Sequence, residues 1–308
     1  MKILFAGTTA NAAEILQYLC DQGRHEIVAV LTREDALVGR KRELRESDVS
    51  AVARKQGLKI IKANLLTAQT NESIRALNAD LGLVVAYGVL LKKDTLLIPR
   101  HGWVNIHFSL LPLLRGAAPV QHALIQGHKE TGVSVFQLDE GMDTGPILAQ
   151  TQTIIEPDED AASLLDRLTK LAITMLDEVL SLIDAGILEP IAQHGQFSMA
   201  PKITRDMARI NFSDSAEKIE NLIRGCNPEP GAWTLFSGDP LKVLSGRAQA
   251  RKPNMNLVTG EILLIDDTVF VATGENGILQ LLEVQPAGKR AMSATDWYRG
   301  IKHKAVFG

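Results

Sequence analysis

The sequence is poor in cysteine and contains no long apolar run. Its only two cysteines among 308 residues, Cys20 and Cys226, lie far apart and form no metal-ligand spacing. No stretch of about 18 consecutive apolar residues occurs, so a membrane-spanning segment is not expected. Two isolated cysteines fit a reducing compartment, and we therefore expect a cytoplasmic protein.

The sequence also lacks a strong excess of charge of one sign. It has 33 Lys and Arg against 36 Asp and Glu, for a formal net charge of −3. The whole molecule is therefore not the strongly basic body typical of nucleic-acid binders, and any such contact must use a local patch. The candidate patch contains Arg40, Lys41, Arg42 and Arg45. By itself, a run of this kind is more typical of a solvated loop.

Length and composition, with 45% hydrophobic residues, predict a globular protein of two domains. In the first half, short apolar runs alternate with helical patterns. The runs that we expect to be strands are residues 3–6, 26–31, 59–61, 81–86 and 103–107. Apolar strands separated by helices indicate a parallel sheet that is buried on both faces. The first run ends at Gly7, and we interpret it as a strand rather than a signal peptide.

The second half has a different pattern. A long amphipathic helix is expected over residues 160–185, followed by a connection containing Pro190, Gly195 and Pro201. Beyond it we expect a helix over residues 215–225. Five short strands with Gly and Asp punctuation then follow, at residues 231–236, 241–244, 260–265, 268–272 and 277–282. Such a series predicts a small antiparallel β-barrel.

Three polar residues in the first half suit acyl transfer to an amine. Asn105 and His107 lie two positions apart at a strand end, so their side chains point to the same side. Asp143 follows 36 residues later, in a turn between Gly141 and Gly145. An amide can stabilise an oxyanion, an imidazole can exchange a proton near neutral pH, and a carboxylate can orient it or accept a proton. Each residue alone also fits a structural role.

Two other kinds of enzyme are disfavoured. There is no G-x-S-x-G motif and neither cysteine has a histidine beside it in sequence, so direct attack by the acceptor amine is preferred over a covalent acyl-enzyme. The first strand is followed by a segment without G-x-G-x-x-G, which disfavours a nicotinamide dehydrogenase. The remaining histidines form no metal spacing, and no metal is expected.

Several motifs with fixed gaps occur between residues 105 and 145. They are Asn105-x-His107, Ser109-Leu110-Leu111-Pro112, Arg115-Gly116-Ala117-Ala118-Pro119 and Asp143-Thr144-Gly145. Together they resemble the signature of the 10-formyltetrahydrofolate-dependent formyltransferases. The likeness extends over nearly the whole chain, through residues 5–8, 85–88 and 282–292.

The resemblance implies roles for individual residues. Asn105, His107 and Asp143 match the catalytic trio of the family. The residues that match its folate-contacting segments are Ser109, Leu110, Leu111, Pro112, Val85, Tyr87 and Gly88. The implied formyl donor is 10-formyltetrahydrofolate, with no metal.

The implied acceptor is the α-amino group of initiator methionyl-tRNA, which the basic patch and residues 285–289 favour. The patch, Arg40, Lys41, Arg42 and Arg45, occupies the position of an insertion that touches the tRNA acceptor stem. Its cations would neutralise phosphates.

The implied architecture is α/β, with a Rossmann-like, mostly parallel sheet flanked by helices and followed by a small C-terminal OB-like antiparallel β-barrel. We expect a catalytic domain at 1–188, a linker at 189–203 and an OB-like, tRNA-contacting domain at 204–308. No membrane contact and no obligate protein partner are expected.

Some residues depart from the family pattern. Phe108 stands where a small residue is usual, and Leu113 and Leu114 replace a basic–aromatic pair, so contacts with the folate or its entrance are expected to differ. Three alternatives stay open: a formyltransferase acting on an amino-sugar nucleotide, a hydrolase of formyltetrahydrofolate, and a non-catalytic tRNA-binding protein.

Overall fold

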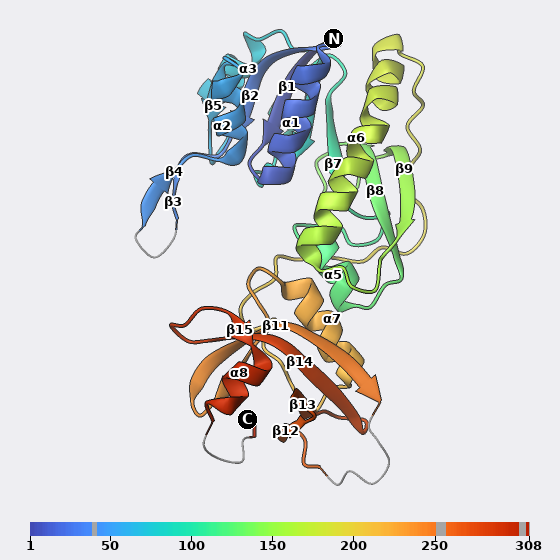
Figure 1. Cartoon of the computed structure of the whole chain (residues 1–308). Coiled ribbons are helices and arrows are strands. Elements are labelled where there is room, and N and C mark those ends of the chain that lie inside the picture. Colours follow the sequence, from blue (N-terminus) through green and yellow to red (C-terminus); the bar gives the residue numbers. More distant parts are fainter. Residues whose placement is uncertain (39–41, 251–256, 302–305, 308) are drawn as a thin grey trace. The chain divides into compact units, whose positions relative to one another are not determined.

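The computed structural model describes residues 1–38, 42–250, 257–301 and 306–307, which form two compact units (Figure 1). The N-terminal unit comprises residues 1–119, 131–154 and 165–200. The C-terminal unit comprises residues 120–130, 155–164 and 201–308. Two short segments that precede residue 165 therefore belong to the C-terminal unit. The division into domains 1–188 and 204–308 with a linker at 189–203 stays a prediction.

The N-terminal unit is built on a seven-stranded sheet with the order β5-β2-β1-β6-β7-β8-β9. The strands are β1 (Lys2–Gly7), β2 (Glu26–Thr32), β5 (Ile60–Lys62), β6 (Leu81–Val85), β7 (Trp103–His107), β8 (Glu130–Gln137) and β9 (Ile147–Ile154). The pairs from β5 to β7 are parallel, and β8 runs antiparallel to β7. The predicted mostly parallel sheet is confirmed, whereas β8 and β9 were not predicted.

Helices accompany this sheet (Figure 1). They are α1 (Ala10–Gln22), α2 (Asp48–Lys55), α3 (Ala68–Arg75), α4 (Lys93–Leu96) and the long α6 (Ala161–Ala185). Their ends follow local chemistry: the Ser47 side chain accepts a hydrogen bond from the Ser50 amide at the start of α2, and α1 ends at Gly23 with φ 62°. No helix among the described residues is long and apolar enough to cross a membrane.

Apolar packing occupies both faces of the sheet. In β1 the side chains of Ile3, Leu4 and Phe5 are fully buried. Leu4 belongs to a core cluster that includes Ile74 of α3, while strand alternation directs Ile3 and Phe5 to the opposite face. Because side chains fill both faces, the carboxyl edge of the parallel strands is the place where polar groups can gather around a ligand.

The C-terminal unit contains a six-stranded sheet with the order β10-β11-β14-β13-β12, and β15 pairs with β14. The elements are α5 (Pro119–Ile125), α7 (Ala216–Cys226), β10 (Trp233–Phe236), β11 (Asp239–Ala250), β12 (Ile262–Ile265), β13 (Thr268–Ala272), β14 (Gly277–Pro286), β15 (Met292–Ser293) and α8 (Ala294–Arg299). The paired strands in this sheet are all antiparallel over the described residues, which confirms the predicted antiparallel C-terminal region.

Strand β11 is longer than the predicted residues 241–244. Its register shifts on both sides of Ser245, as in a β-bulge. A Cβ on Gly246 would lie 3.3 Å from the Ile223 side chain of α7. The glycine that looks like the end of a strand in sequence instead lets the strand pass closely over a helix.

The basic segment forms a small hairpin in the N-terminal unit. Strands β3 (Ala36–Val38) and β4 (Glu43–Arg45) pair with each other and with no strand of the seven-stranded sheet (Figure 1). All six of these residues are exposed. The predicted solvated loop is therefore a two-stranded hairpin over its described part. Arg40 and Lys41 lie outside the described residues.

Candidate active site

The site lies at the carboxyl end of β7, where the sheet changes from parallel to antiparallel pairing. Asn105 pairs with Val84 of β6 on one side and with Phe136 of β8 on the other. His107 pairs with Ser134. The two-residue spacing places Asn105 and His107 on the same face of the strand, as predicted.

His107 is buried, with 5% of its surface exposed. Its Nε2 lies 2.9 Å from the Leu114 carbonyl oxygen. Because a carbonyl oxygen only accepts, Nε2 carries the proton, and the neutral ring leaves Nδ1 unprotonated. Burial lowers the pKa of His107, although the Asp143 carboxylate and the Leu114 carbonyl act in the opposite direction. The imidazole is therefore neutral at pH 7, with Nδ1 able to accept a proton.

The structure brings Asp143 to this ring from a distant turn. Asp143 Oδ2 lies 3.7 Å from His107 Nδ1. The same oxygen accepts a 2.7 Å hydrogen bond from the Gly116 amide. Asp143 has a φ of 53°, and a Cβ at Gly145 would overlap the Gln137 carbonyl oxygen. The glycine therefore permits a close backbone approach that holds the carboxylate beside the imidazole.

Asn105 contributes a buried polar atom that the chain does not satisfy. Within the described residues, its side-chain oxygen has no hydrogen-bond partner. Leaving a buried acceptor unpaired is unfavourable by about 1–3 kcal/mol, so such atoms call for a specific explanation. The carbonyl and amino ends of an amide have nearly the same shape, and a half-turn exchanges acceptor for donor. The Asn105 side chain is therefore suited to a polar ligand at the strand end.

The predicted folate-contacting segment after His107 is held firmly by strands β8 and β9. The Ser109 hydroxyl donates to the Leu113 carbonyl at 2.6 Å, and the Ser134 hydroxyl donates to the Ser109 carbonyl at 2.6 Å. The Leu111 amide donates to Ser134 Oγ at 3.0 Å. Gln150 donates to the Leu111 carbonyl at 3.0 Å. Ser134 and Gln150 were not predicted, because their strands were not.

The other predicted folate-contacting segment follows β6, the neighbour of β7. The side chains of Val85 and Tyr87 are buried, and the Tyr87 hydroxyl donates to the Ala63 carbonyl at 2.9 Å. Burial raises the pKa of Tyr87 to about 12. Ala86 and Gly88 are exposed. A ligand beside this segment would therefore meet Ala86, Gly88 and the backbone rather than the Tyr87 ring.

The three departures from the family pattern separate into two environments. Phe108 and Leu114 are buried, whereas Leu113 is 40% exposed. Leu110 and Pro112, on the same segment, are half-buried. Of the three departures, Leu113 is therefore the one whose side chain reaches the surface near the predicted folate contacts.

In the described part of the chain, the residues do not meet the needs of a metal centre or of a nucleophilic cysteine. The described residues contain no group of three His, Cys, Asp or Glu side chains placed to hold a metal ion. Cys20 and Cys226 are free thiols, and burial raises the pKa of Cys226 to about 11. A buried, protonated thiol is inert at neutral pH, which agrees with chemistry that uses no covalent acyl-enzyme.

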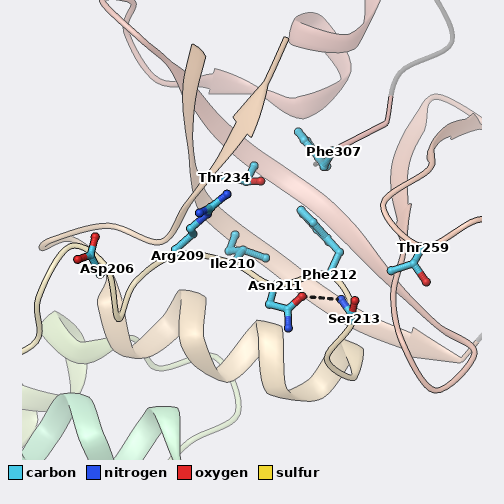
Figure 2. A pocket seen from close by; sticks show the side chains of 9 residues that line it. All are labelled: Asp206, Arg209, Ile210, Asn211, Phe212, Ser213, Thr234, Thr259 and Phe307. Carbon is cyan, nitrogen blue, oxygen red and sulfur yellow. Dashed lines mark hydrogen bonds between the residues drawn. The ribbon is translucent and has the colours of Figure 1, made fainter. Parts of the chain in front are cut away.

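A separate hollow of about 560 Å³ lies within the C-terminal unit (Figure 2). It is lined by Asp206, Arg209, Ile210, Asn211, Phe212, Ser213, Thr234, Thr259 and Phe307. The guanidinium groups of Arg205 and Arg209 lie over the Trp233 ring, 4.8 and 5.6 Å from its centroid. Exposed cations beside an aromatic ring suit the phosphates and bases of a nucleic acid.

Comparison with known families now gives the class of the protein. Residues 1–180 match the family described as Formyl transferase, and residues 202–302 match the family described as Formyl transferase, C-terminal domain. The chain belongs to the formyltransferase family. The predicted family resemblance is confirmed.

Two individual relatives are similar to this chain over nearly its full length. The methionyl-tRNA formyltransferase of Renibacterium salmoninarum is 44% identical over 98% of this chain and 97% of that protein. The methionyl-tRNA formyltransferase of Paenarthrobacter aurescens is 43% identical over 98% of this chain and 97% of that protein.

Solved structures share the fold at lower identity. An N-formyltransferase from Helicobacter canadensis, crystallised with folinic acid and dTDP-3-aminofucose, has a TM-score of 0.69 and 18% identity. The alignment covers 93% of this chain and 99% of that one.

Proposed function

We propose that the protein transfers the formyl group of 10-formyltetrahydrofolate to the α-amino group of methionyl-tRNA(fMet), and so supplies initiator tRNA for translation. The observation that carries the proposal is the convergence of Asn105, His107 and Asp143 at one strand end, with His107 Nδ1 3.7 Å from Asp143 Oδ2. Relatives that share more than 40% of their residues over nearly the full length are methionyl-tRNA formyltransferases.

The residues at the strand ends fit a folate donor. The unpaired Asn105 oxygen marks a place for a polar ligand group at the end of β7. The exposed surface at Ala86 and Gly88 follows the neighbouring β6, and residues 109–112 follow β7 directly. These segments would hold the folate, while Asn105 would lie at the formyl group. The bound donor would supply an electrophilic formyl carbon on N10.

The chain's own groups have complementary tasks in the transfer. A half-turned Asn105 amide donates to the formyl oxygen, where negative charge develops. His107 Nδ1 and Asp143 Oδ2 together accept the proton that the attacking amine loses. As the bond between the formyl carbon and N10 breaks, the same pair would return this proton to N10, so that tetrahydrofolate leaves as a neutral amine. An α-amino group has a pKa of about 8, so a useful neutral fraction attacks at pH 7. Because the Leu114 carbonyl holds the Nε2 proton, His107 becomes a second donor to the oxyanion only after Nδ1 is protonated.

The tRNA would be bound by cations outside this cluster. Arg42 and Arg45 are exposed on the hairpin, and Arg45 forms a 3.3 Å ion pair with the exposed Glu43. Exposed pairs of this kind are weak, so Arg45 can exchange its partner for a phosphate. Arg205 and Arg209 of the C-terminal unit offer a second cationic surface. We propose Arg40, Lys41, Arg42 and Arg45 as contacts to the acceptor stem.

The cellular setting forms part of the proposal. Two free cysteines fit the reducing cytoplasm, where aminoacyl-tRNA is found. We also propose that the chain acts without an obligate protein partner. Fractionation and size-exclusion chromatography of the active protein test both statements, and activity that requires a second protein would contradict the latter.

A direct assay tests the activity. The purified protein is incubated with 10-formyltetrahydrofolate and charged initiator tRNA, and formyl-methionine is measured after hydrolysis. Parallel reactions contain a nucleotide-linked amino sugar or no acceptor. We expect formyl-methionyl-tRNA in the first reaction only. Transfer to the sugar, or formate release without an acceptor, would replace this proposal with one of the alternatives.

A further inference from the structure

A segment that the sequence presents as part of a linker lies along the catalytic loops of the N-terminal unit. The Leu114 amide donates to Ser198 Oγ at 2.9 Å, and the Arg115 amide donates to the Ser198 carbonyl at 2.8 Å. The Ala200 amide donates back to the Arg115 carbonyl at 2.7 Å. Residues 114–116 supply both the carbonyl that binds His107 and the amide that binds Asp143, so this segment supports both partners.

Gln193, in the same segment, reaches the turn that carries Asp143. Its Nε2 donates to the Asp143 carbonyl at 2.9 Å and to the Gly145 carbonyl at 2.7 Å. Its Oε1 accepts from Arg115 at 3.2 Å through Nε and at 2.6 Å through Nη2. Both amide hydrogens and the amide oxygen are therefore engaged, and the side chain joins the two loops that meet at the catalytic carboxylate.

Asp143 needs such support because of its backbone conformation. A non-glycine residue with a φ of 53° is held there only by its surroundings. The carboxylate itself accepts a hydrogen bond from the Gly116 amide. Gln193 fixes the carbonyl groups on both sides of Thr144 and thereby the direction in which the Asp143 side chain leaves the turn.

We propose that Gln193 is a positioning residue for formyl transfer, which sets the Asp143 carboxylate beside His107 through its two hydrogen bonds to the turn. This inference rests on the proposed function for its kinetic test. The side-chain NH2 group of Gln193, which donates to the turn, has this role, and the side-chain oxygen, which accepts from Arg115, does not. Substitutions can separate the donated from the accepted hydrogen bonds.

Two variants make the separation. Gln193→Leu removes the donors and the acceptor, whereas Gln193→Glu keeps the acceptor for Arg115 and removes both donors. We expect each variant to lower kcat by about 10- to 100-fold, the effect of losing two hydrogen bonds, with the KM for folate and for tRNA changed less than about threefold. Gln196→Ala, an exposed position of the same segment, is the matched control and should leave kcat unchanged.

The pH profile supplies a readout that general loosening of the fold would not change. The Asp143 carboxylate raises the pKa of His107 against the effect of burial. If the carboxylate moves away, the pKa of His107 falls further, and the acid limb of the kcat/KM profile should shift to lower pH in both Gln193 variants. The thermal midpoint of each variant shows that it is folded.

Hydrogen exchange at residues 141–146, measured without substrates, tests the same role independently of the reaction. We expect exchange at least about tenfold faster in both Gln193 variants than in the Gln196→Ala control. Wild-type kcat in either folded Gln193 variant, or wild-type behaviour of Gln193→Glu alone, overturns the positioning role, as does unchanged exchange. An inactive wild-type protein instead overturns the proposed function, and the exchange experiment then decides on Gln193 by itself.

Discussion

The turn that carries Asp143 and the β3–β4 hairpin are both short connections of the N-terminal unit, but they are built in opposite ways. The turn is fixed from several directions by Gly116 and Gln193, and Gly145 allows close backbone contact with Gln137. The hairpin pairs only with itself, and Leu37, Val38 and Leu44 are exposed on it by 54%, 46% and 68%. The Asp143 turn is therefore held in place by hydrogen bonds, whereas the hairpin extends from the sheet with its side chains exposed.

This difference fits the two tasks that we propose for these segments. Proton transfer requires the reacting atoms to be placed within a fraction of an ångström, which a hydrogen-bonded turn achieves before the substrate arrives. Attraction of a phosphate backbone depends on charge and acts over several ångströms, so exposed cations on a small hairpin suffice. Substitutions in the turn should therefore change kcat, and substitutions in the hairpin should change tRNA affinity and its dependence on salt.

The largest effect is expected from the catalytic trio. Asn105→Ala and Asp143→Ala should each lower kcat by about 100- to 1000-fold, because each removes a group that acts on the transition state. Steady-state formylation of initiator methionyl-tRNA is the measurement. Glu140→Ala, which removes an exposed carboxylate from the same region, is the control and should leave kcat unchanged. Near-normal turnover of either trio variant in folded form would refute its assignment.

The next effect concerns the hairpin. Replacing Arg40, Lys41, Arg42 and Arg45 together with Ala should weaken tRNA binding by about tenfold or more near physiological salt. It should also reduce the slope of log K against log salt by up to about 3. A filter-binding titration at several salt concentrations measures both. Folate binding should stay the same. An unchanged salt slope would contradict the proposed tRNA contact and would mean that the hairpin is an ordinary solvated surface.

A smaller effect is expected in the pH dependence of the free energy of unfolding, to which His107 contributes. Burial lowers the pKa of His107, so the unfolded chain binds more protons than the folded one as the pH falls below about 6.5. The contribution of His107 to stability is therefore present above that pH and lost progressively below it. Urea midpoints at pH 7.5 and 5.0 should differ more for the wild type than for His107→Gln. Equal differences in the two proteins would contradict a lowered pKa.

The smallest effect on tRNA affinity is expected from a substitution in the C-terminal unit. Arg209→Ala removes one exposed cation beside the Trp233 ring and should weaken tRNA binding by only about two- to fivefold, with a salt slope reduced by ~1. The same titration measures it, with Glu275→Ala as an exposed control of opposite charge. If Arg209→Ala weakened tRNA binding as much as the hairpin variant with four substitutions, the main tRNA contact would lie in the C-terminal unit instead.

Much of the fold could be predicted because burial leaves a pattern in the sequence. Strands β1, β2, β6 and β7 are apolar runs, and α6 is a long amphipathic helix, so each was predicted close to its observed position. The hairpin escaped prediction as strands because each strand has only 3 residues, all exposed, which is too short for a periodic pattern to be recognised. Strand β9 has no buried residue, and β11 contains a glycine that packs closely against a helix.

The family motifs mark Asn105, His107 and Asp143, but no motif marks the groups that support them. Gln193 binds backbone carbonyl groups at Asp143 and Gly145, and no spacing in the sequence encodes a contact between a side chain and a distant backbone. The same holds for Ser134 and Gln150, which hold residues 109–111. The burial of the Tyr87 side chain was likewise not evident, because a tyrosine at a strand end can point either way.

The proposed mechanism depends on the Asp143 carboxylate and His107, which together take a proton from the attacking amine. Single-turnover formylation by Asp143→Asn tests it most directly, since asparagine keeps an oxygen for the Gly116 amide but cannot accept the proton. The account predicts a transfer step slower by about 100-fold or more, with the Kd values of folate and tRNA within about threefold of wild type. Transfer by the folded variant at the wild-type rate would contradict it.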